Sequence, residues 1–355
     1  MDFTDRASAV RKGEELDASR VEAFLKDSIP ELKGEIRIGQ FPSGYSNLTY
    51  LVTIGDRELV LRRPPIGTKA RTAHDMSREY RILNALKPVF PYCPEPLVYT
   101  EDAAVMGCPF YVMERIHGIV LRKELPLGLS YTPEQARRLF EHLLDVQLEL
   151  HAVDYQKIGL ADFGKPEGYV ERQVVGWTKR YRAARTDDAP DCEEVMAWLE
   201  EKMPPDSDRP AIIHNDYRFD NVVLDEQDRM RIIGVLDWEM ATVGDPLMDL
   251  GNSMSYWIEP GDPPEMEIVR MMPTNIEGAP TRKEMVERYE AQSGRSIEHF
   301  DFYYCFGLFR LAVIAQQIYY RYYHGQTADE RFKMLIFAVK TLVNAAEKVI
   351  GGSDR

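Results

Sequence analysis

The hydrophobic pattern of the chain changes period near residue 115, and this change constrains the fold more than any other feature. Before it, residues alternate between apolar and polar or are rich in β-branched types, as in β-strands, at EIRIGQ (35–40), LTYLVTIG (48–55) and RELVLRR (57–63). Gly55-Asp56 lies between the last two stretches and is typical of a hairpin turn. From about residue 132 onward helical spacing dominates. We therefore expect an α+β protein, with a small β-rich part followed by a larger, mostly helical part.

The same periodicities predict the remaining elements. Thr132-Pro133 followed by Glu134-Gln135 is a helix N-cap signature. A chain of 355 residues is too long for one core, so we expect two lobes, 1–115 and 116–355. The predicted helices are 18–29, 72–86, 132–152, 168–185, 191–202, 281–292, 299–324 and 327–350; the further strands are 110–115, 211–214 and 231–238; the loops are 187–190 and 259–280.

Composition excludes several classes of protein. The chain is 44% hydrophobic and 29% charged, as globular proteins are, and its net charge of −14 disfavours a nucleic-acid partner. Its four cysteines form no Cys-x-x-Cys pair, which fits a reducing compartment. The first residues lack the apolar core of a signal peptide. The apolar stretch 302–320 contains Arg310, Gln316 and Gln317, which favours a buried helix over a membrane span. We expect a cytoplasmic protein without a membrane partner; the oligomeric state stays open.

Residues 211–221, AIIHNDYRFDN, place polar side chains directly after a short apolar strand. Phosphoryl transfer to a hydroxyl group needs a carboxylate base, together with amide and carboxylate oxygens that hold Mg²⁺. Asp216 would be the base, Asn221 a metal ligand, and His214 a brace for the loop. Asp237, which follows the second apolar strand RIIGVLD, would be another metal ligand.

Asp216 and Asn221 could instead be ordinary turn residues after a strand. Two upstream features favour the catalytic interpretation. The stretch 39–47, GQFPSGYSN, is a small-residue turn between strands, whose backbone N–H groups could bind phosphates. Arg62 ends a strand and Glu79 lies on the next helix, as in the cation–glutamate pair that kinases use to hold phosphates. Either charge alone would be an ordinary surface residue.

Several stretches together resemble the aminoglycoside phosphotransferase-like branch of the protein-kinase-like fold, and within it the phosphotransferase domains related to those fused to acyl-CoA dehydrogenases. The resemblance implies a two-lobed fold and a kinase that uses Mg²⁺ and ATP or GTP. The two most specific stretches are IIHNDYRFDNVVLD and GVLDWEMATVGDPLMDLG, and QFPSGYSNLTYLV, VLRRPP, REYRIL, FYVMERIHG, LELHAVD and GLADFGKPEGYVERQVVGW also match.

The resemblance also implies roles for individual residues. Asp216 would be the catalytic base, and Asn221 and Asp237 would be the Mg²⁺ ligands. Arg62 and Glu79 would form the ion pair that anchors the phosphates. The nucleotide would further meet the phosphate-covering residues Ser43, Gly44, Tyr45, Ser46 and Asn47, and the backbone of Glu114 and Ile116 at the adenine.

The chain departs from this pattern at three positions. Arg62 stands where most kinases have lysine, and its planar fork binds differently, so the choice between ATP and GTP stays open. Glu239 stands where protein kinases have the glycine of Asp-Phe-Gly, either near the metal or in a structural role. Asn215 stands between His214 and Asp216, where glycine or arginine is usual. The triplet Asp162-Phe163-Gly164 precedes the His214 loop and follows no apolar strand, so we interpret it as a surface turn.

Other functions fit the sequence less well. His74-Asp75 would suit a metal-dependent phosphohydrolase, but the other histidines have no ligand spacing. The stretch 44–48 lacks the second glycine of a serine-hydrolase elbow. A catalytically weak nucleotide-binding pseudokinase that acts as a scaffold remains an alternative because of Arg62.

The acceptor is the least determined part. Residues 168–185 combine Tyr169, Trp177 and Tyr181 with the cations Arg172, Lys179, Arg180, Arg182 and Arg185, although such residues are more often core and solvated surface. A basic wall suits an anionic acceptor, and the resemblance points to a hydroxyacyl-CoA or a similar metabolite. The alternative acceptor is an aminoglycoside or amino alcohol, for which 187–208 would supply carboxylates.

Overall fold

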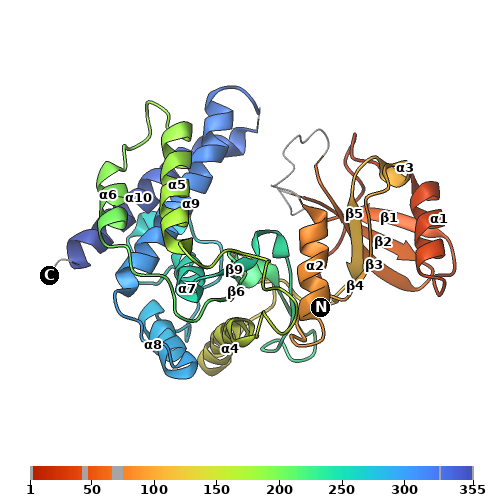
Figure 1. The fold of residues 1–355 in the computed structure, drawn as a ribbon, viewed down its shortest axis with the longest axis horizontal. Coiled ribbons are helices and arrows are strands. Elements are labelled where there is room, and N and C mark those ends of the chain that lie inside the picture. Colours follow the sequence, from red (N-terminus) through yellow and green to blue (C-terminus); the bar gives the residue numbers. More distant parts are fainter. Residues whose placement is uncertain (1–2, 42–46, 66–74, 328, 354–355) are drawn as a thin grey trace. The chain divides into compact units, whose positions relative to one another are not determined.

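The computed structural model describes residues 3–41, 47–65, 75–327 and 329–353. Contacts within the chain divide it into two compact units (Figure 1): unit 1 holds Met1–Val120 and Val222–Ala241, and unit 2 holds Leu121–Asn221 and Thr242–Arg355. This division differs from the single boundary expected between 115 and 116, because residues 222–241 return to unit 1. The nucleotide-binding role of the first unit stays a prediction.

Unit 1 is built on an antiparallel sheet with the strand order β1-β2-β3-β5-β4. Burial alternates strictly along β2, as the sequence pattern predicts. The predicted hairpin turn joins β2 to β3, and Gly55 has a φ of +58° there; a Cβ would lie 2.2 Å from the carbonyl oxygen of Lys33. The strands are β1 (Ile36–Gln40), β2 (Leu48–Ile54), β3 (Arg57–Arg63), β4 (Pro96–Thr100) and β5 (Phe110–Glu114).

Helices α1 and α2 flank this sheet on opposite sides (Figure 1). An aspartate caps the N-terminus of each helix of the unit, because its side chain accepts backbone N–H groups of the first turn: Asp17 for α1, Asp75 for α2 and Asp102 for α3. The core joins Val21 and Leu25 of α1 to the inward residues of the strands. The helices are α1 (Ala18–Ser28), α2 (Met76–Leu86) and α3 (Ala103–Met106).

A second hairpin, β7 (Val222–Leu224) with β8 (Ile232–Val235), explains why residues 222–241 belong to unit 1. Ile119 and Leu224 exchange backbone hydrogen bonds of 2.9 and 2.8 Å, and the N–H of Val235 donates to the carbonyl of Tyr92 at 2.7 Å. A Cβ at Gly234 would lie 2.8 Å from the side chain of Ile116. The hairpin ends in the 3₁₀ helix η2 (Trp238–Met240), so it brings Asp237 into this unit.

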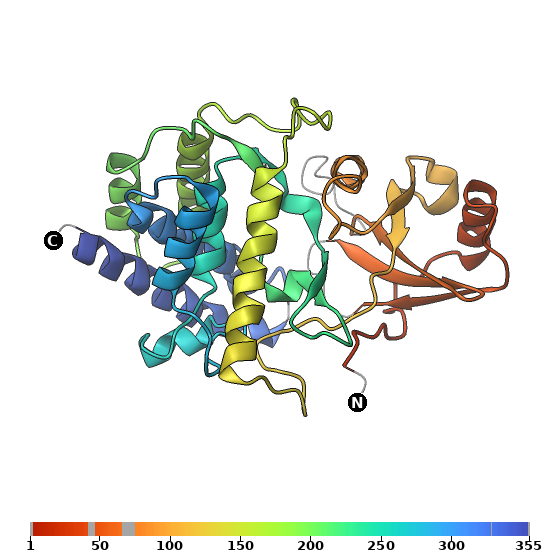
Figure 2. The same cartoon turned by 90° about the horizontal axis from the view of Figure 1, so that it is seen from below.

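Unit 2 is mostly helical, with one short sheet of β6 (Ala211–Ile213) and β9 (Thr242–Gly244). Its long helix α4, yellow in Figure 2, begins with the predicted capping box, in which Thr132 and Gln135 bind each other's backbone. The helices are α4 (Pro133–Ala152), α5 (Tyr169–Ala184), α6 (Glu193–Glu201), α7 (Pro246–Ser255), α8 (Arg282–Ser293), α9 (Phe300–Tyr323) and α10 (Leu335–Ser353), with 3₁₀ turns η1 (Phe219–Asn221), η3 (Pro264–Ile268) and η4 (Glu330–Met334).

Helices α7 and α9 approach each other closely in the core of unit 2. A Cβ at Gly251 would lie 2.3 Å from the carbonyl oxygen of Tyr303, and one at Gly307 would lie 2.5 Å from that of Gly251. The glycines therefore permit backbone contact between the helices. As predicted, α9 is a buried helix. Among the described residues, no helix combines the length and apolarity that crossing a membrane requires.

The structure corrects several predicted elements. Strands β4, β7 and β9 and helices α3 and α7 were not predicted, because most are too short to show a period. The helix expected at 327–350 is the 3₁₀ turn η4 followed by α10, and the strand expected at 231–238 ends at Val235. The loop expected at 259–280 contains η3.

Candidate active site

Asp216 and Asn221, expected at the two ends of a catalytic loop, lie together in unit 2. The Asn221 amide nitrogen donates to the Asp216 carboxylate at 2.9 Å and to its carbonyl oxygen at 2.8 Å. The hydroxyl of Tyr256 donates to the other carboxylate oxygen at 2.9 Å. The Asp216 side chain is 20% exposed. The loop thus fixes a carboxylate that remains open to solvent.

His214, predicted to brace this loop, forms hydrogen bonds within it. It is fully buried, and its ring Nδ1 accepts the backbone N–H of Asp216 at 3.3 Å. Its own backbone N–H donates to the carboxylate of Asp249 at 3.2 Å. The histidine therefore orients the backbone of the candidate base instead of touching its carboxylate.

Asp249, on α7, is a loop-supporting residue to which the sequence analysis gave no role. It is fully buried and accepts the N–H of Asn215 at 2.6 Å, together with side-chain nitrogens of His151 at 3.0 Å and Gln147 at 3.1 Å. Burial acts to raise its pKa, but the hydrogen bond and charge of His151 outweigh burial and hold the pKa below its usual value. Asp245-Pro246 is a helix N-cap signature, which could have predicted α7, the helix that carries Asp249.

Asn215 has a φ of +64°, in the left-handed region that asparagine tolerates better than most residues. Its side-chain oxygen accepts the hydroxyl of Tyr169 and the amide of Asn252, both at 3.4 Å. Its carbonyl oxygen accepts Nη2 of Arg310 at 2.8 Å. Side chains from α5, α7 and α9 therefore fix the residue that precedes Asp216.

Arg218 is a second residue of the loop to which the sequence analysis gave no role. Its guanidinium lies 3.4 Å from the carboxylate of Asp216 and 2.6 Å from that of Asp220, and it covers the Tyr256 ring at 4.6 Å. Burial raises the pKa of Asp220 to about 6, against the lowering effect of Arg218. Arg218 thus places a positive charge beside the candidate base.

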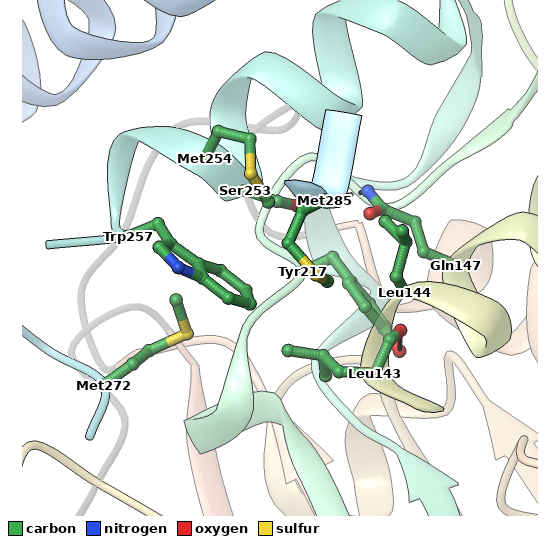
Figure 3. A pocket seen from close by; sticks show the side chains of 9 residues that line it. All are labelled: Leu143, Leu144, Gln147, Tyr217, Ser253, Met254, Trp257, Met272 and Met285. Carbon is green, nitrogen blue, oxygen red and sulfur yellow. Dashed lines mark hydrogen bonds between the residues drawn. The ribbon is translucent and has the colours of Figure 1, made fainter. Parts of the chain in front are cut away.

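A pocket adjoins this loop within unit 2, lined on one side by Tyr217 and on others by Trp257, Met254, Met272 and Met285 (Figure 3). Its polar lining residues are Gln147 and Ser253, and none of its lining residues is charged. A lining without a cation, whose one amide group already donates to Asp249 and Ser253, offers no charge that would hold a phosphate or another anion. We therefore interpret the pocket as a gap in the packing beneath the loop.

In unit 1, Arg62 lies among three carboxylates. Its guanidinium is 3.4 Å from Glu79, 2.8 Å from Asp237 and 3.5 Å from Glu239. The amide nitrogen of Asn47 bridges Glu79 and Glu239, at 2.8 Å from each. The predicted pairing of Arg62 with Glu79 is therefore present, and Arg62 binds two further carboxylates as well.

In this cluster, burial and the neighbouring charges shift the pKa values of Arg62 and Glu79 in opposing directions. Burial acts to lower the pKa of Arg62, but the negative charges of Glu79 and Asp237 outweigh it and hold that pKa well above its usual value. Burial raises the pKa of Glu79, and Asp237 acts in the same direction, against Arg62. Arginine suits this position better than lysine would, because its planar fork can bind several carboxylates at once.

The oxygen ligands predicted for Mg²⁺ fit that cation in their chemistry. Asp237, with a φ of +63° and a side chain 35% exposed, offers carboxylate oxygens in unit 1. In unit 2 the Asn221 amide nitrogen binds Asp216, which leaves the amide oxygen as its ligand atom. The described residues contain no cluster of three or more His, Cys, Asp or Glu that would hold a metal unaided. Kinases use only one or two carboxylates together with substrate phosphates, so the residues fit.

Only some of the remaining predicted residues lie in the described part of the chain. Ser43, Gly44, Tyr45 and Ser46 lie outside the described residues, as does His74. Glu114 ends β5, where its N–H donates to the carbonyl of Glu95 at 2.9 Å, and Ile116 follows it.

Asp162-Phe163-Gly164 forms a turn, as predicted. Asp162 is exposed, whereas the Phe163 side chain is buried. A Cβ at Gly164 would lie 2.5 Å from the carbonyl oxygen of Val243 in β9. The glycine is explained by this close packing and needs no metal.

Comparison with known proteins shows which family and fold the chain shares. Residues 37–274 match the model of the Phosphotransferase enzyme family. The crystal structure of a candidate aminoglycoside phosphotransferase from Ralstonia eutropha JMP134 is 31% identical, with a TM-score of 0.77 over 94% of this chain and 99% of that chain. Acyl-CoA dehydrogenase family member 10 of Mus musculus is 35% identical over 322 residues, which is 90% of this chain but only 30% of that protein.

A more distant structure shows the fold alone. It is an aminoglycoside phosphotransferase in complex with GDP and kanamycin, 15% identical, with a TM-score of 0.60 over 94% of this chain and 98% of that chain. The expected protein-kinase-like fold, with a five-stranded sheet in one unit and a helical second unit, is therefore confirmed.

Proposed function

This chain belongs to the Phosphotransferase enzyme family, and we propose that it transfers the γ-phosphate of ATP or GTP to a hydroxyl group of a small anionic acceptor. Membership supports phosphotransferase chemistry on small molecules. The relatives' acyl-CoA dehydrogenase name supports a hydroxyacyl-CoA or a similar metabolite as the acceptor.

Asp216 carries this proposal. A general base must be held in place, remain ionised near neutral pH and be reachable by the hydroxyl it deprotonates. Asn221 and Tyr256 hold the carboxylate through hydrogen bonds of 2.9 Å each, and the side chain is still 20% exposed. A purely structural aspartate in the same unit, Asp249, is by contrast fully buried.

In the proposed reaction, Asp216 accepts the proton of the acceptor hydroxyl as its oxygen attacks the γ-phosphorus. The bond from that phosphorus to the bridging oxygen breaks, and the nucleoside diphosphate leaves. Asn221 keeps the base oriented, and His214 fixes the backbone beneath it.

The residues of unit 1 serve the nucleotide in this proposal. Arg62, oriented by Glu79, binds phosphate oxygens with its fork. Ser43 to Asn47, of which 43–46 lie outside the described residues, would cover the phosphates, and the backbone of Glu114 and Ile116 would meet the adenine. Asp237 and Asn221 would hold Mg²⁺, which when bound neutralises charge on the transferred phosphate. Glu239, 3.5 Å from Arg62, would assist the metal through water or serve only as a partner of that arginine.

Two other functions use the same residues. An aminoglycoside or amino-alcohol kinase would need carboxylates around a cationic acceptor, and the distant complex with kanamycin supports this alternative by fold only. A pseudokinase scaffold would bind nucleotide without turnover. The ordered hydrogen bonds around Asp216 favour an enzyme over a scaffold.

The test measures nucleoside diphosphate release with Mg²⁺ and ATP or GTP. The acceptors are hydroxyacyl-CoAs, amino alcohols, sugars and aminoglycosides, and thermal shifts report nucleotide binding in parallel because a specific ligand stabilises the folded state. We expect hydroxyacyl-CoAs to stimulate turnover most. Faster turnover with kanamycin would contradict the proposed acceptor, and nucleotide binding without turnover would support the scaffold.

A further inference from the structure

Two arginines of unit 2 lie against one indole ring. The guanidinium of Arg180 is 4.5 Å from the centroid of Trp177, and that of Arg310 is 5.3 Å from the same centroid. Both distances are within the range of cation–π attraction. Trp177 and Arg180 lie on α5, whereas Arg310 comes from α9, so the fold itself brings the two charges together.

Arg310 is a buried cation that has no counterion among the described residues. Its side chain belongs to a residue only 4% exposed, and its Nη2 donates to the carbonyl of Asn215 at 2.8 Å. Its Nη1 is buried without a hydrogen-bond partner, and no carboxylate of the described residues forms a salt bridge with Arg310. Buried charges in proteins are normally paired, because leaving them unpaired costs several kcal/mol. A bound anion would balance this charge and accept the hydrogen bond of Nη1.

Arg180 is exposed and also has no salt bridge within the described parts of the chain. Its neighbours on α5 differ. Arg182 pairs with Glu193 at 2.6 Å, and Arg172 donates to the backbone carbonyls of Lys165 and Glu167. The chain has a net charge of −14, so carboxylates are abundant, yet neither guanidinium group on this ring pairs with one in the described part of the chain.

This pair is connected to the catalytic loop. Arg310 binds the carbonyl of Asn215, the residue before Asp216. Tyr169, on the same helix as Trp177, donates to the side chain of Asn215 at 3.4 Å. An anion at the arginines would therefore be bound by the same elements that fix the candidate base.

We propose that Arg180 and Arg310, held against Trp177, form an anion subsite that receives the negatively charged group of the acceptor. The inference rests on the proposed function and specifies which residues select the acceptor. The ligand chemistry is an anionic oxygen group, either the carboxylate of a free hydroxy acid or the phosphates of a coenzyme A thioester. Arg180 is the exposed contact, and Arg310 supplies the second charge and the unsatisfied donor. Two positive charges repel a polycationic aminoglycoside.

Kinetics of the complete enzyme with Mg²⁺ and nucleotide test the subsite. The acceptor probes are 3-hydroxybutyrate, 3-hydroxybutyryl-CoA and the neutral 1,3-butanediol. We expect Arg180→Gln to raise KM for the preferred anionic probe about tenfold, with kcat within about twofold and KM for the diol unchanged, since charge-assisted hydrogen bonds contribute about this much. Which anionic probe responds distinguishes the carboxylate from the coenzyme phosphates.

Arg182→Gln is the matched control, because it removes the same charge from the same helix but from a residue already paired with Glu193. An equal rise of KM in this variant would overturn the subsite, because it would mean that any positive charge on α5 attracts the anionic acceptor. An equal rise for the neutral diol in Arg180→Gln would overturn it too.

Binding without turnover separates this inference from the proposed function. Calorimetry with the same probes uses Asp216→Asn, alone and combined with Arg180→Gln, Arg310→Lys or Arg310→Gln. We expect anionic probes to bind Asp216→Asn, to bind about tenfold more weakly when either arginine is replaced by glutamine, and to be partly rescued by Arg310→Lys. Such binding supports the subsite even if no phosphate transfer is found. Binding that neither arginine affects would overturn it.

Discussion

Arg62 and Arg310 are both buried arginines, yet their surroundings are opposite. Arg62, 7% exposed in unit 1, lies within 3.5 Å of three carboxylates, Glu79, Asp237 and Glu239. Arg310, 4% exposed in unit 2, donates to a backbone carbonyl oxygen and lies against an indole ring. One cation is outnumbered by negative charge, and the other has none within salt-bridge distance among the described residues.

The difference indicates which ligand charge each region accommodates. The Arg62 cluster has an excess of carboxylate, which suits added cations such as Mg²⁺ together with the phosphates they accompany. The Arg310 region has an excess of positive charge, which suits an anionic group. Donor nucleotide and acceptor would thus be recognised by different charge balances, and each prediction below alters one of them.

The largest effect is expected when a carboxylate is removed from the Arg62 cluster. Asp237→Asn should lower Mg²⁺-dependent phosphate transfer by about 10²–10⁴-fold, because it removes a proposed metal ligand and a partner of Arg62. Steady-state kinetics across a Mg²⁺ titration measure this. Asp162→Asn, in the exposed Asp-Phe-Gly turn, is the matched control and should leave the rate unchanged. If Asp162→Asn were the more damaging variant, our assignment of the metal ligand would be wrong.

The same substitution at the two arginines should have unequal costs. Arg62→Gln leaves three carboxylates without their cation and should lower the free energy of unfolding by about 3–5 kcal/mol. Arg310→Gln removes a charge that has no counterion among the described residues, so only about 1 kcal/mol is expected, from the hydrogen bond to the carbonyl of Asn215. Urea unfolding measures both. Equal losses would remove the contrast between the two regions.

Acid pH should reveal the buried carboxylate that supports the loop. The pKa of Asp249 is lowered in the fold, where the hydrogen bond of His151 outweighs burial. Its charge therefore stabilises the fold above the ordinary value of about 3.9, and this contribution is lost as the pH falls below it. Unfolding measured from pH 6 downward should show a flatter acid limb in Asp249→Asn than in the parent.

Asp245, one turn earlier on the same helix, is the control for that experiment. Burial raises its pKa, against the backbone N–H groups of Leu247 and Met248 that it caps. Its ionisation therefore costs stability, and protonation in acid restores it. Asp245→Asn, which preserves the N-cap, should make the acid limb steeper. The same change of slope in both variants would contradict the assigned directions.

The smallest effect is expected at the capping box of α4, the helix that carries Gln147 and His151 to Asp249. Thr132→Ala removes the side chain that accepts the N–H of Gln135 and should cost about 1 kcal/mol. Thermal unfolding measures the loss, and the rate of phosphate transfer at 25 °C should not change. A large loss of activity would mean that this helix end, far in sequence from the loop, has a role in the site that we have not assigned.

Much of the candidate site could be predicted because its residues follow strong local patterns. The strand that precedes His214 and the one that precedes Asp237 are short apolar runs with polar residues at their ends, and Arg62 lies near the end of a strand with a continuous apolar centre. Local spacing therefore singled out Asp216, Asn221 and Asp237 as candidates, and their catalytic and metal-binding roles stay predictions.

The rest depends on contacts between distant parts of the chain. His151 and Asp249 lie 98 residues apart in sequence, and Asn215 and Arg310 lie 95 apart. No local period connects such pairs. The buried residues that support the loop, and the two arginines that lie against Trp177, could therefore be found only from the fold. Three-residue strands such as β7 and β9 are also too short to show alternation, which is why the return of residues 222–241 to unit 1 was not predicted.

The central claim is that Asp216 is the base in phosphate transfer to an anionic hydroxyl compound. Transfer of a radiolabelled γ-phosphate from Mg²⁺–nucleotide into 3-hydroxybutyryl-CoA, compared between the parent and Asp216→Asn, tests it most directly. We predict label in the acceptor with the parent and a rate lower by about 10²–10⁴-fold in the variant, with nucleotide binding retained. Equal transfer by both proteins would contradict the account.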